Sequence, residues 1–316
     1  MRPSARIEVV KSFCTFAAGL GLSLSSAAFA FAASGDAVIR APAGKSEIVI
    51  TTTTRLAGAI DSLTWAGREF INSTDHGRQL QSACSFDNSP TANAETFNPT
   101  EAGSRRDHIG PTSTSRLREL SAHGNHLRTR TQMAFWLAPG EHSEGQRARN
   151  TNTLSDYLLT KDVRLGYERW PQALDYRVTF TLPTNAVHRA AQFEAVTGYM
   201  PPEFDTFWQF NPQTQKLEPL SDGPGEINQP VVLATADGKH AMGIFAHPQL
   251  QPHTTGPSYG RWRFRAEQVV KWNCVFRVRD AQPLRAGDYS FRMLIPIGTR
   301  AEVEQMLKDW TIAPQR

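Results

Sequence analysis

The sequence predicts an all-β protein, built as a large antiparallel sandwich of two sheets with one short helix near the C-terminus. Its apolar residues recur with the period of two that is typical of strands, as in the β-branched run 47–54. Gly, Pro, Asn or Asp bounds each run, as expected for strands that end in turns. Many strands with almost no helix favour a sandwich or a barrel, and about 15 strands in one domain favour a large two-sheet sandwich.

The expected strands begin early and continue almost to the end of the chain. Segments 47–54 and 58–65 are the first two, and the turn Ala66-Gly67 leads into a third strand at 69–72. The later candidates are 127–137, 173–182, 192–199, 231–234, 241–246, 261–264, 269–278 and 287–296. Two other segments, 87–116 and 140–155, are predicted to be long loops, which in a compact domain are usually functional or disordered.

One segment, 300–310, has the spacing of a helix. Thr299 is expected to cap its first turn, and Glu302 three residues later completes a capping box. Its apolar side chains fall on one face, and they are Val303, Met306, Leu307 and Trp310.

The N-terminus resembles a targeting segment. Three basic residues within the first eleven precede an apolar run over 13–31, which ends in small-x-small sequences such as Ala28-Phe29-Ala30. This order predicts a secretory signal peptide over 1–30 and a secreted or periplasmic protein. The alternative is an uncleaved membrane anchor, which the shortness of the run and its Ser, Gly and Ala content disfavour. The remaining residues, 31–316, are expected to form a single domain.

The charge excludes some classes of partner. Removing the leader, which carries three basic residues and one acidic residue, lowers the formal net charge from +4 to about +2. That charge is too small to indicate binding to nucleic acid or to an anionic membrane. No segment after residue 32 is long and apolar enough to cross a bilayer.

No cofactor or metal is expected. The chain has no nucleophile elbow, phosphate loop or dinucleotide fingerprint. His123 and His126 lie three residues apart, but Gly124 between them argues against a helix that would turn both toward one ion. Cys84 and Cys274 are open to two interpretations: a disulfide, which export would permit, or two separate buried thiols.

The first candidate site is the polar segment around residues 75–79. If this segment is extended, His76 and Arg78 share one face, and Asp75 and Gln79 share the other. Arg78 offers a rigid fork for a carboxylate or for neighbouring hydroxyls, and the histidine could transfer protons. The segment therefore indicates a sugar-binding or acid/base site. The alternative is a turn whose Asp and Arg satisfy the backbone and each other.

A second candidate is Glu101, which follows Asn98 and Pro99 on a predicted loop that ends at Gly103. Pro99 stiffens this loop, so that a carboxylate held over a pocket could act as a general acid or base. The alternative is a solvated loop glutamate.

Further candidates come from the second half of the chain. Glu203 and Asp205 alternate with aromatic residues, a composition found in glycosidases, although it also fits an edge strand with polar outer positions. A second group contains three aromatic residues whose rings could stack on a sugar, and a histidine that could bind hydroxyls. The alternative is that the tryptophans are core residues, as tryptophans usually are. The members of this group are His247, Tyr259, Trp262 and Trp272.

The segment 58–72, Gly-Ala-Ile-x-Ser-Leu-x-Trp-x-Gly-x-Glu-Phe-Ile-Asn, resembles the opening of galactose-mutarotase-like supersandwich proteins. In those proteins an early hairpin carries a motif of the type Gly-Gly-x-Ile-x-Ser-Leu. The resemblance covers about 48–81 and a general strand rhythm afterwards. It implies a supersandwich and a carbohydrate ligand, as in aldose epimerases, some polysaccharide lyases and some glycoside hydrolases. It identifies no catalytic residue here, because fold analogy does not supply function.

These observations predict a secreted carbohydrate-active protein, an enzyme that hydrolyses, eliminates or isomerises an oligo- or polysaccharide by acid/base chemistry. His76, Arg78 and Glu101 are the predicted catalytic residues, with Arg78 neutralising the carboxylate if the sugar is uronic. The predicted substrate-binding residues are Asp75, Gln79, Asn98, Glu203, Asp205, His247, Tyr259, Trp262 and Trp272. The alternatives are a non-catalytic glycan-binding module and a structural envelope protein. The enzyme and the module both require distant polar residues to gather in one cavity.

Overall fold

The structure is a computed structural model that describes residues 34–247, 254–279 and 284–312. The chain divides into two units, Met1–Phe31 and Ala32–Arg316, and the fold below is that of the second unit. The predicted signal peptide lies outside the described residues. Among the described residues, no helix combines the length and the hydropathy needed to span a membrane.

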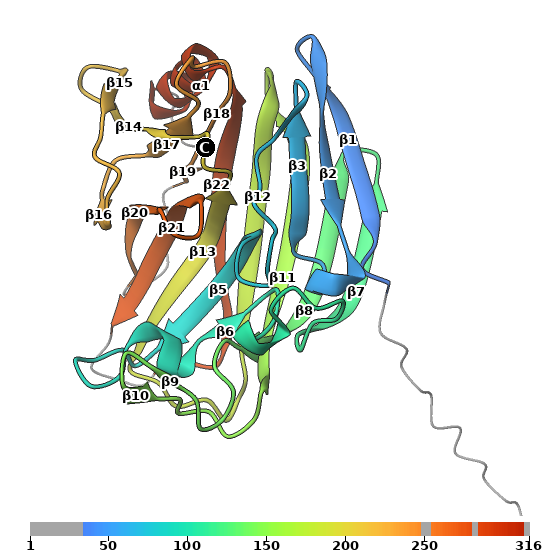
Figure 1. The fold of residues 1–316 in the computed structure, drawn as a ribbon, viewed down its shortest axis with the longest axis vertical. Coiled ribbons are helices and arrows are strands. Elements are labelled where there is room, and N and C mark those ends of the chain that lie inside the picture. The colour runs from blue at the N-terminus through green and yellow to red at the C-terminus, as the bar shows by residue number, and fades with distance from the viewer. Residues whose placement is uncertain (1–33, 248–253, 280–283, 313–316) are drawn as a thin grey trace, which may run out of the picture. The chain divides into compact units, whose positions relative to one another are not determined.

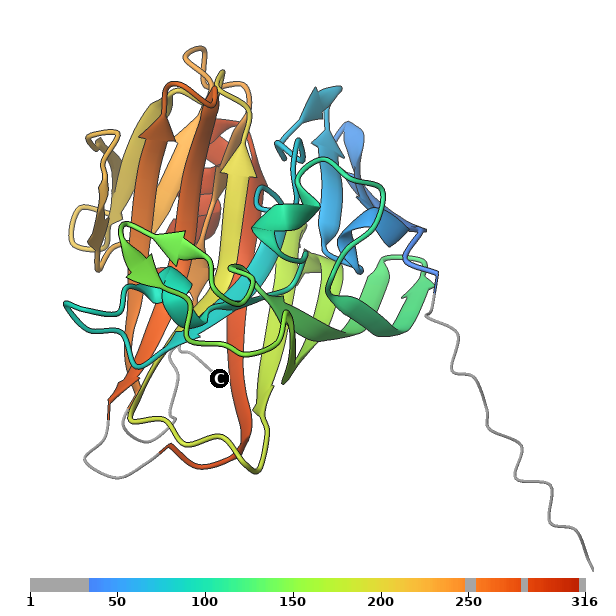
Figure 2. The same ribbon diagram turned by 60° about the horizontal axis from the view of Figure 1, so that its bottom comes forward.

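The predicted all-β class is confirmed, and two curved halves of sheet carry the fold (Figures 1 and 2). The first half contains, in order of pairing, β7 (Arg116–His123), β8 (His126–Phe135), β11 (Leu154–Tyr167), β12 (Trp170–Leu182) and β22 (Gly287–Gly298). It continues beyond β22 through β18 (Ala241–Gly243), β17 (Val231–Ala234), β14 (Thr206–Asn211) and β15 (Lys216–Pro219), while β19 (Phe245–Ala246) also pairs with β22.

The second half runs through eight strands. They are, in order of pairing, β1 (Ala37–Ala43), β2 (Ser46–Thr52), β3 (Ile60–Trp65), β5 (Leu80–Phe86), β13 (Ala190–Met200), β21 (Val269–Arg279), β20 (Thr254–Phe264) and β16 (Gly225–Ile227). The short strand β4 (Arg68–Glu69) pairs with β3. Another short strand, β6 (Pro99–Thr100), pairs with both β5 and β8 and so joins the two halves into one continuous 20-stranded sheet.

The core lies between the two halves. Ring contacts cross it, because Phe291 on β22 lies 5.2 Å from Phe193 on β13 and 4.6 Å from Phe276 on β21. In the second half, β13 and β21 therefore pack on the first half through alternate side chains, while the intervening residues point away from the core. This second, outward-pointing set forms the candidate site.

The C-terminal helix is confirmed as α1 (Arg300–Ile312). The capping box forms as predicted: the Thr299 amide donates to the Glu302 carboxylate at 2.8 Å, and the Glu302 amide donates to the Thr299 hydroxyl at 3.3 Å. The predicted apolar face is buried in a second, smaller core with residues of β17 and β18. The helix packs on one end of the first half of the sheet (Figure 1).

The two predicted loops contain short elements. Segment 87–116 holds two 3-10 turns, η2 (Ala94–Phe97) and η3 (Arg105–Asp107), as well as β6. Segment 140–155 holds a small hairpin of β9 (His142–Ser143) and β10 (Gln146–Arg147), and a further turn, η1 (Thr54–Leu56), precedes β3. The cysteines are free and buried on β5 and β21, with β13 between these strands, which confirms the interpretation as two separate thiols. Among the described residues, no group of His, Cys, Asp and Glu is arranged to hold a metal.

Candidate functional site

A cavity of about 600 Å³ opens on the outward face of the second half of the sheet. The strands β5, β13, β21 and β20 form its floor, and their register aligns side chains into rows. One row is Gln81, Thr197, Asn273 and Gly260, and the next is Tyr199, Lys271 and Trp262. Such rows follow from the two-residue period of the strands, which places every second side chain on the cavity side.

A register shift in β13 shapes the floor. Pairing with both neighbouring strands is offset just after Glu194, as in a β-bulge. Because of this extra residue, Glu194 and Thr197 both line the cavity although they are three residues apart. The bulge therefore places a carboxylate beside the amide and ammonium groups of β21.

Lys271 is the centre of the polar cluster on this floor. Its Nζ lies 2.8 Å from Glu194 Oε1, and Asn273 Nδ2 donates to the same oxygen at 2.6 Å. The ammonium group also lies 4.9 Å from the ring centre of Tyr199 and 5.0 Å from that of Trp262, distances suited to cation–π attraction.

The pKa values of this cluster follow from burial and pairing. Burial lowers the pKa of Lys271, but the attraction of Glu194 and Tyr199 outweighs it, so the pKa is raised above its ordinary value. Burial likewise raises the pKa of Tyr199, although Lys271 opposes the shift. At neutral pH the lysine is therefore protonated and the phenol is neutral.

Glycine 260 makes room for the indole of Trp262. A Cβ at Gly260 would lie 2.1 Å from the Trp262 ring and 2.5 Å from Asn273 Oδ1. The Gly260 amide donates to that oxygen at 3.0 Å and so orients the Asn273 side chain. A larger residue would displace the ring and the amide together.

One edge of the cavity carries a second carboxylate held by an arginine. Arg277 donates two hydrogen bonds of 2.8 Å to Glu226, and its Nε donates to Gln192 Oε1 at 2.9 Å. Glu226 and Gln192 line the cavity, whereas Arg277 does not. The bidentate geometry fixes the carboxylate in orientation.

The loop 72–79 builds another wall. Arg78 Nε lies 3.1 Å from Asp75 Oδ2, and its Nη1 donates to the Glu267 carbonyl at 3.2 Å. Trp136 packs against Gly77, where a Cβ would lie 2.9 Å from the ring. Asp75, Arg78 and Trp136 all line the cavity, so this wall combines an ion pair with an aromatic ring.

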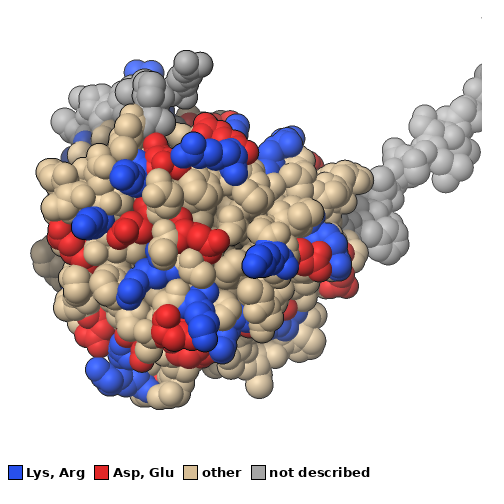
Figure 3. All heavy atoms as spheres, turned by 90° about the horizontal axis from the view of Figure 1, so that it is seen from above, with Lys and Arg blue, Asp and Glu red and all other residues tan. Residues whose placement is uncertain are grey.

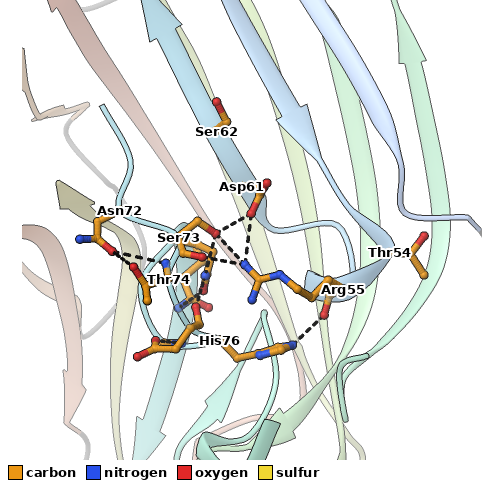
Figure 4. Close-up of polar contacts among 12 residues, drawn as sticks. Thr54, Arg55, Asp61, Ser62, Asn72, Ser73, Thr74 and His76 are labelled. Carbon is orange, nitrogen blue, oxygen red and sulfur yellow. Dashed lines mark hydrogen bonds and ion pairs between the residues drawn. The ribbon is translucent and has the colours of Figure 1, made fainter. Parts of the chain in front are cut away.

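A buried network holds this loop from behind (Figure 4). The ring nitrogens of His76 lie 2.7 Å from the His108 carbonyl and 2.8 Å from the Arg55 carbonyl. Arg55 Nη2 donates to the Ser73 carbonyl at 2.7 Å and lies 3.3 Å from Asp61 Oδ1. His76 is fully buried, so it anchors the loop and does not face the cavity.

Gln79 belongs to the same network. It is fully buried and donates to the Ser73 hydroxyl at 3.2 Å and to the Asp75 carbonyl. Two of the four residues predicted in this segment therefore support the wall, and the other two, Asp75 and Arg78, line the cavity.

Glu101 is also placed away from the cavity. It is fully buried and forms an ion pair with Lys161, which is itself fully buried and donates to the Gly58 carbonyl at 2.9 Å. The Ser82 amide donates to the other carboxylate oxygen at 3.1 Å. Burial raises the pKa of Glu101, although Lys161 opposes the shift. The carboxylate is thus an internal link between β11, the start of β3 and β5.

The predicted residues of the second half of the chain are mostly elsewhere. Glu203 pairs with Arg68 at 3.0 Å on the surface, and the Asp205 carbonyl accepts from Arg263 at 2.5 Å. His247 packs near Phe245 and Tyr167, and burial, followed by the charge of Arg292, lowers its pKa. None of these three predicted residues lines the cavity.

Two predicted aromatic residues are core residues. The hydroxyl of Tyr259, which is buried, accepts from the Ala246 amide at 3.0 Å. Trp272 is fully buried against Gly198, where a Cβ would lie 2.6 Å from the indole. Trp262, by contrast, lines the cavity, as does Asn98, whose Nδ2 donates to the Cys84 carbonyl at 2.7 Å.

The predicted gathering of His76, Arg78, Glu101 and His247 in one cavity is therefore wrong, because only Arg78 lines it. The sequence interpretation also missed the cluster of Lys271, Glu194 and Asn273. A signal was present, because the predicted strand 269–278 alternates apolar residues with Lys271 and Asn273. That alternation is typical of a strand whose second face is polar.

Comparison with known proteins identifies no family. No family model matches the chain, and no curated protein matches it. Similar solved structures include a putative aldose 1-epimerase from Klebsiella pneumoniae subsp. pneumoniae, at 11% identity and a TM-score of 0.45, with 89% of this chain and 93% of that chain covered. An alpha-galactosidase from Lactobacillus brevis matches at 8% identity and a TM-score of 0.42, with 84% of this chain and 40% of that chain covered.

A heparan sulfate lyase from Pedobacter heparinus matches at 11% identity and a TM-score of 0.40, with 84% of this chain and 35% of that chain covered. The chain thus spans about a third of the length of this lyase. The putative aldose 1-epimerase among these structures agrees with the resemblance to galactose-mutarotase-like proteins at the level of the fold, and with TM-scores of 0.40 to 0.45 nothing about ligand or activity follows for this chain.

Proposed function

We propose that the cavity on β5, β13, β21 and β20 binds a sugar unit of a glycan. The observation that carries this proposal is the pairing of two indole rings, Trp262 and Trp136, with ordered polar side chains in one cavity. Its volume of about 600 Å³ lies within the roughly 300–1,000 Å³ typical of small-ligand sites. A pyranose has both apolar C–H faces, which stack on aromatic rings, and equatorial hydroxyls, which need fixed donors and acceptors.

The amides of the cavity suit hydroxyl groups. Asn98 Nδ2 and Gln192 Oε1 each hold one hydrogen bond to the protein, to the Cys84 carbonyl and to Arg277 respectively. The other half of each amide has no hydrogen bond to the described residues, so it is oriented and open to a ligand. An amide fixed in this way pays little entropy when it binds a hydroxyl.

We further propose that the protein acts on the bound glycan as an enzyme. Lys271 is protonated and Tyr199 is neutral at neutral pH, so neither serves as a general base. Histidine is absent from the described residues that line the cavity. The base is therefore sought among the carboxylates that line the cavity, and we assign it to Glu194, which lies on the floor and is fixed in orientation by Lys271 and Asn273. It replaces His76 and Glu101 in the predicted role.

The second candidate function is a non-catalytic glycan-binding module. The observation that favours it is that both cations lining the cavity, Arg78 and Lys271, are already engaged by carboxylates of the protein. Such pairing suits a rigid recognition surface as well as it suits a catalytic site. Export of the protein, in either case, is proposed from the N-terminal sequence, and the N-terminal residue of the mature chain would test it.

The experiment is a panel of neutral oligosaccharides measured by calorimetry, with the products analysed in parallel. We expect Trp262→Ala to weaken binding about tenfold, since a stacked aromatic ring contributes about 0.5–1.5 kcal/mol in addition to the apolar area that it buries. The matched control is Trp170→Ala, a partly buried tryptophan outside the cavity. Unchanged affinity in Trp262→Ala would overturn the assignment of the cavity.

Product analysis separates the two candidate functions. New reducing ends, unsaturated products or epimerised sugars that disappear in Glu194→Gln support the enzyme. Tight binding without any of these products supports the module. The Glu194→Gln substitution keeps an oxygen for Lys271 and Asn273, so circular dichroism should show the same fold.

A further inference from the structure

The cavity proposed to bind a sugar is rich in acidic groups. Two cations line it, Arg78 and Lys271. Five carboxylates line it as well, and they are Asp75, Glu95, Glu194, Glu226 and Glu267. The formal charge of the lining is therefore negative, which opposes the earlier expectation that Arg78 receives a uronic acid.

Pairing within the protein uses both cations. Arg78 is 3.1 Å from Asp75, and Lys271 is 2.8 Å from Glu194. Glu226 is held by Arg277, which lies outside the lining. These three ion pairs leave no lining cation free to receive an anionic ligand.

Two carboxylates remain unpaired. Glu95 lies on η2 (Ala94–Phe97) and is partly exposed, and Glu267 is exposed in the turn between β20 and β21. Neither carboxylate makes a hydrogen bond or an ion pair with the described residues. Both line the same cavity, so they add negative charge where a ligand would bind.

The η2 turn is anchored by residues other than Glu95. The Thr96 hydroxyl donates to the Asn93 carbonyl at 2.8 Å, and Arg149 Nε donates to the Thr96 hydroxyl at 3.1 Å. Asn93 Nδ2 donates to the Ser143 carbonyl at 3.2 Å. The carboxylate of Glu95 therefore lies on a turn that other residues hold in place, and it does not itself hold the turn.

We propose that the cavity is specific for a cationic amino sugar, whose ammonium group pairs with Glu95. This inference rests on the proposed glycan-binding function and adds the substrate class. An ammonium group gains a charge-assisted hydrogen bond from the free carboxylate. A uronate or a sulfated sugar meets like charge and has no free partner, so it is rejected.

The basic and acidic side chains of the face seen in Figure 3 are intermixed, with no broad field of one sign. The proposed selection by charge rests on the cavity lining, which carries the two unpaired carboxylates.

The test is isothermal titration calorimetry with three oligosaccharides of equal length, made of glucosamine, N-acetylglucosamine or galacturonic acid. It is done at a mildly acidic pH that protonates the amine. We expect the glucosamine oligomer to bind about tenfold tighter than the acetylated one, and the galacturonate to bind weakest. Higher salt should reduce the preference for the amine.

Glu95→Gln is the diagnostic variant. It should remove the preference for the amine, a loss of about tenfold, while the affinity for the N-acetylglucosamine oligomer stays the same. The control is Glu144→Gln, an exposed glutamate outside this cavity, which should retain the preference.

The outcomes are distinguishable. Equal or tighter binding of the acetylated or the galacturonate oligomer in the wild type overturns the amino-sugar inference and leaves the proposed glycan binding intact. An amine preference that persists in Glu95→Gln overturns the assigned role of Glu95. Binding of none of the three oligomers overturns the amino-sugar inference, and the proposed function is overturned as well only if the panel of neutral oligosaccharides also fails to bind.

Discussion

Replacing Lys161 by methionine should destabilise the protein severely. Lys161 and Glu101 are both fully buried, and the lysine also donates to the Gly58 carbonyl. In Lys161→Met the Glu101 carboxylate keeps a single protein donor, the Ser82 amide at 3.1 Å. Removing one partner of a buried ion pair costs about 3–5 kcal/mol. That is a large fraction of the roughly 5–15 kcal/mol by which a domain is stable.

The assay is urea unfolding followed by circular dichroism, with thermal melts in parallel. A cost of this size lowers the Tm by roughly 10 °C in a large domain. The double variant Glu101→Leu/Lys161→Met should recover most of the loss, because an apolar pair of similar volume replaces a buried ion pair at little cost. The surface variant Arg40→Met, which loses only an exposed ion pair with Glu47, should change stability by less than about 1 kcal/mol.

The pH dependence gives a second readout of the same pair. Burial raises the pKa of Glu101, and the loss of Lys161 removes the charge that opposes this shift. A raised folded-state pKa means that the folded protein binds more protons than the unfolded chain, so stability falls as the pH rises through that range. Lys161→Met should therefore regain stability as the pH is lowered. A cost below about 1 kcal/mol in the single variant, or a double variant as unstable as the single one, would refute the structural role assigned to Glu101.

Three further predictions concern the floor and the edges of the sheet. Gly198→Ala should cost about 1–3 kcal/mol in urea unfolding, because its Cβ would lie 2.6 Å from the Trp272 ring. Burial raises the pKa of Asp175, but hydrogen bonds and charges of Arg177 and Arg292 outweigh this effect and lower the pKa below its ordinary value, so the carboxylate contributes stability above its unfolded pKa. That contribution is lost as the pH falls below about 4. The free energy of unfolding of Asp175→Asn, measured by urea unfolding, should therefore depend less on pH in this range than that of the wild type. Cys84 and Cys274, both buried and free, should react with a thiol reagent only after unfolding.

The fold class and the helix were predictable because both rest on local periodicity. The apolar stripe of α1 and its capping box lie within a dozen residues, so no tertiary information is needed to find them. Strands with β-branched runs, such as β2 and β3, were found for the same reason.

Several strands of the structure were missed, among them β5 and β14, and three of the missed strands have a common property. β1, β7 and β11 each present polar or charged residues on one face, so that their composition resembles that of loops. In β11 the buried Lys161 further interrupts the apolar set on the inner face. The joining of the two halves at β6 was not predictable either, because it depends on two residues that pair with strands distant in the sequence.

The candidate site was only partly predictable for a physical reason. A polar residue inside apolar strand sequence either faces an open cavity or is buried with partners, since buried polar groups must be hydrogen-bonded. Composition alone does not separate the two cases, and His76, Gln79 and Glu101 all belong to the second. Asp75 and Arg78 belong to the first.

The polar residues that line the cavity nevertheless depend on the buried polar residues. The cavity wall that carries Arg78 is a loop, and loops are mobile unless their backbone is bound to the body of the protein. His76 supplies this attachment through the carbonyls of Arg55 and His108, which lie on segments far apart in the sequence. The buried polar residues therefore act on the ligand through the position of Arg78 and Asp75. A site that recognises a sugar by oriented hydrogen bonds needs such support, because an oriented group loses little freedom on binding.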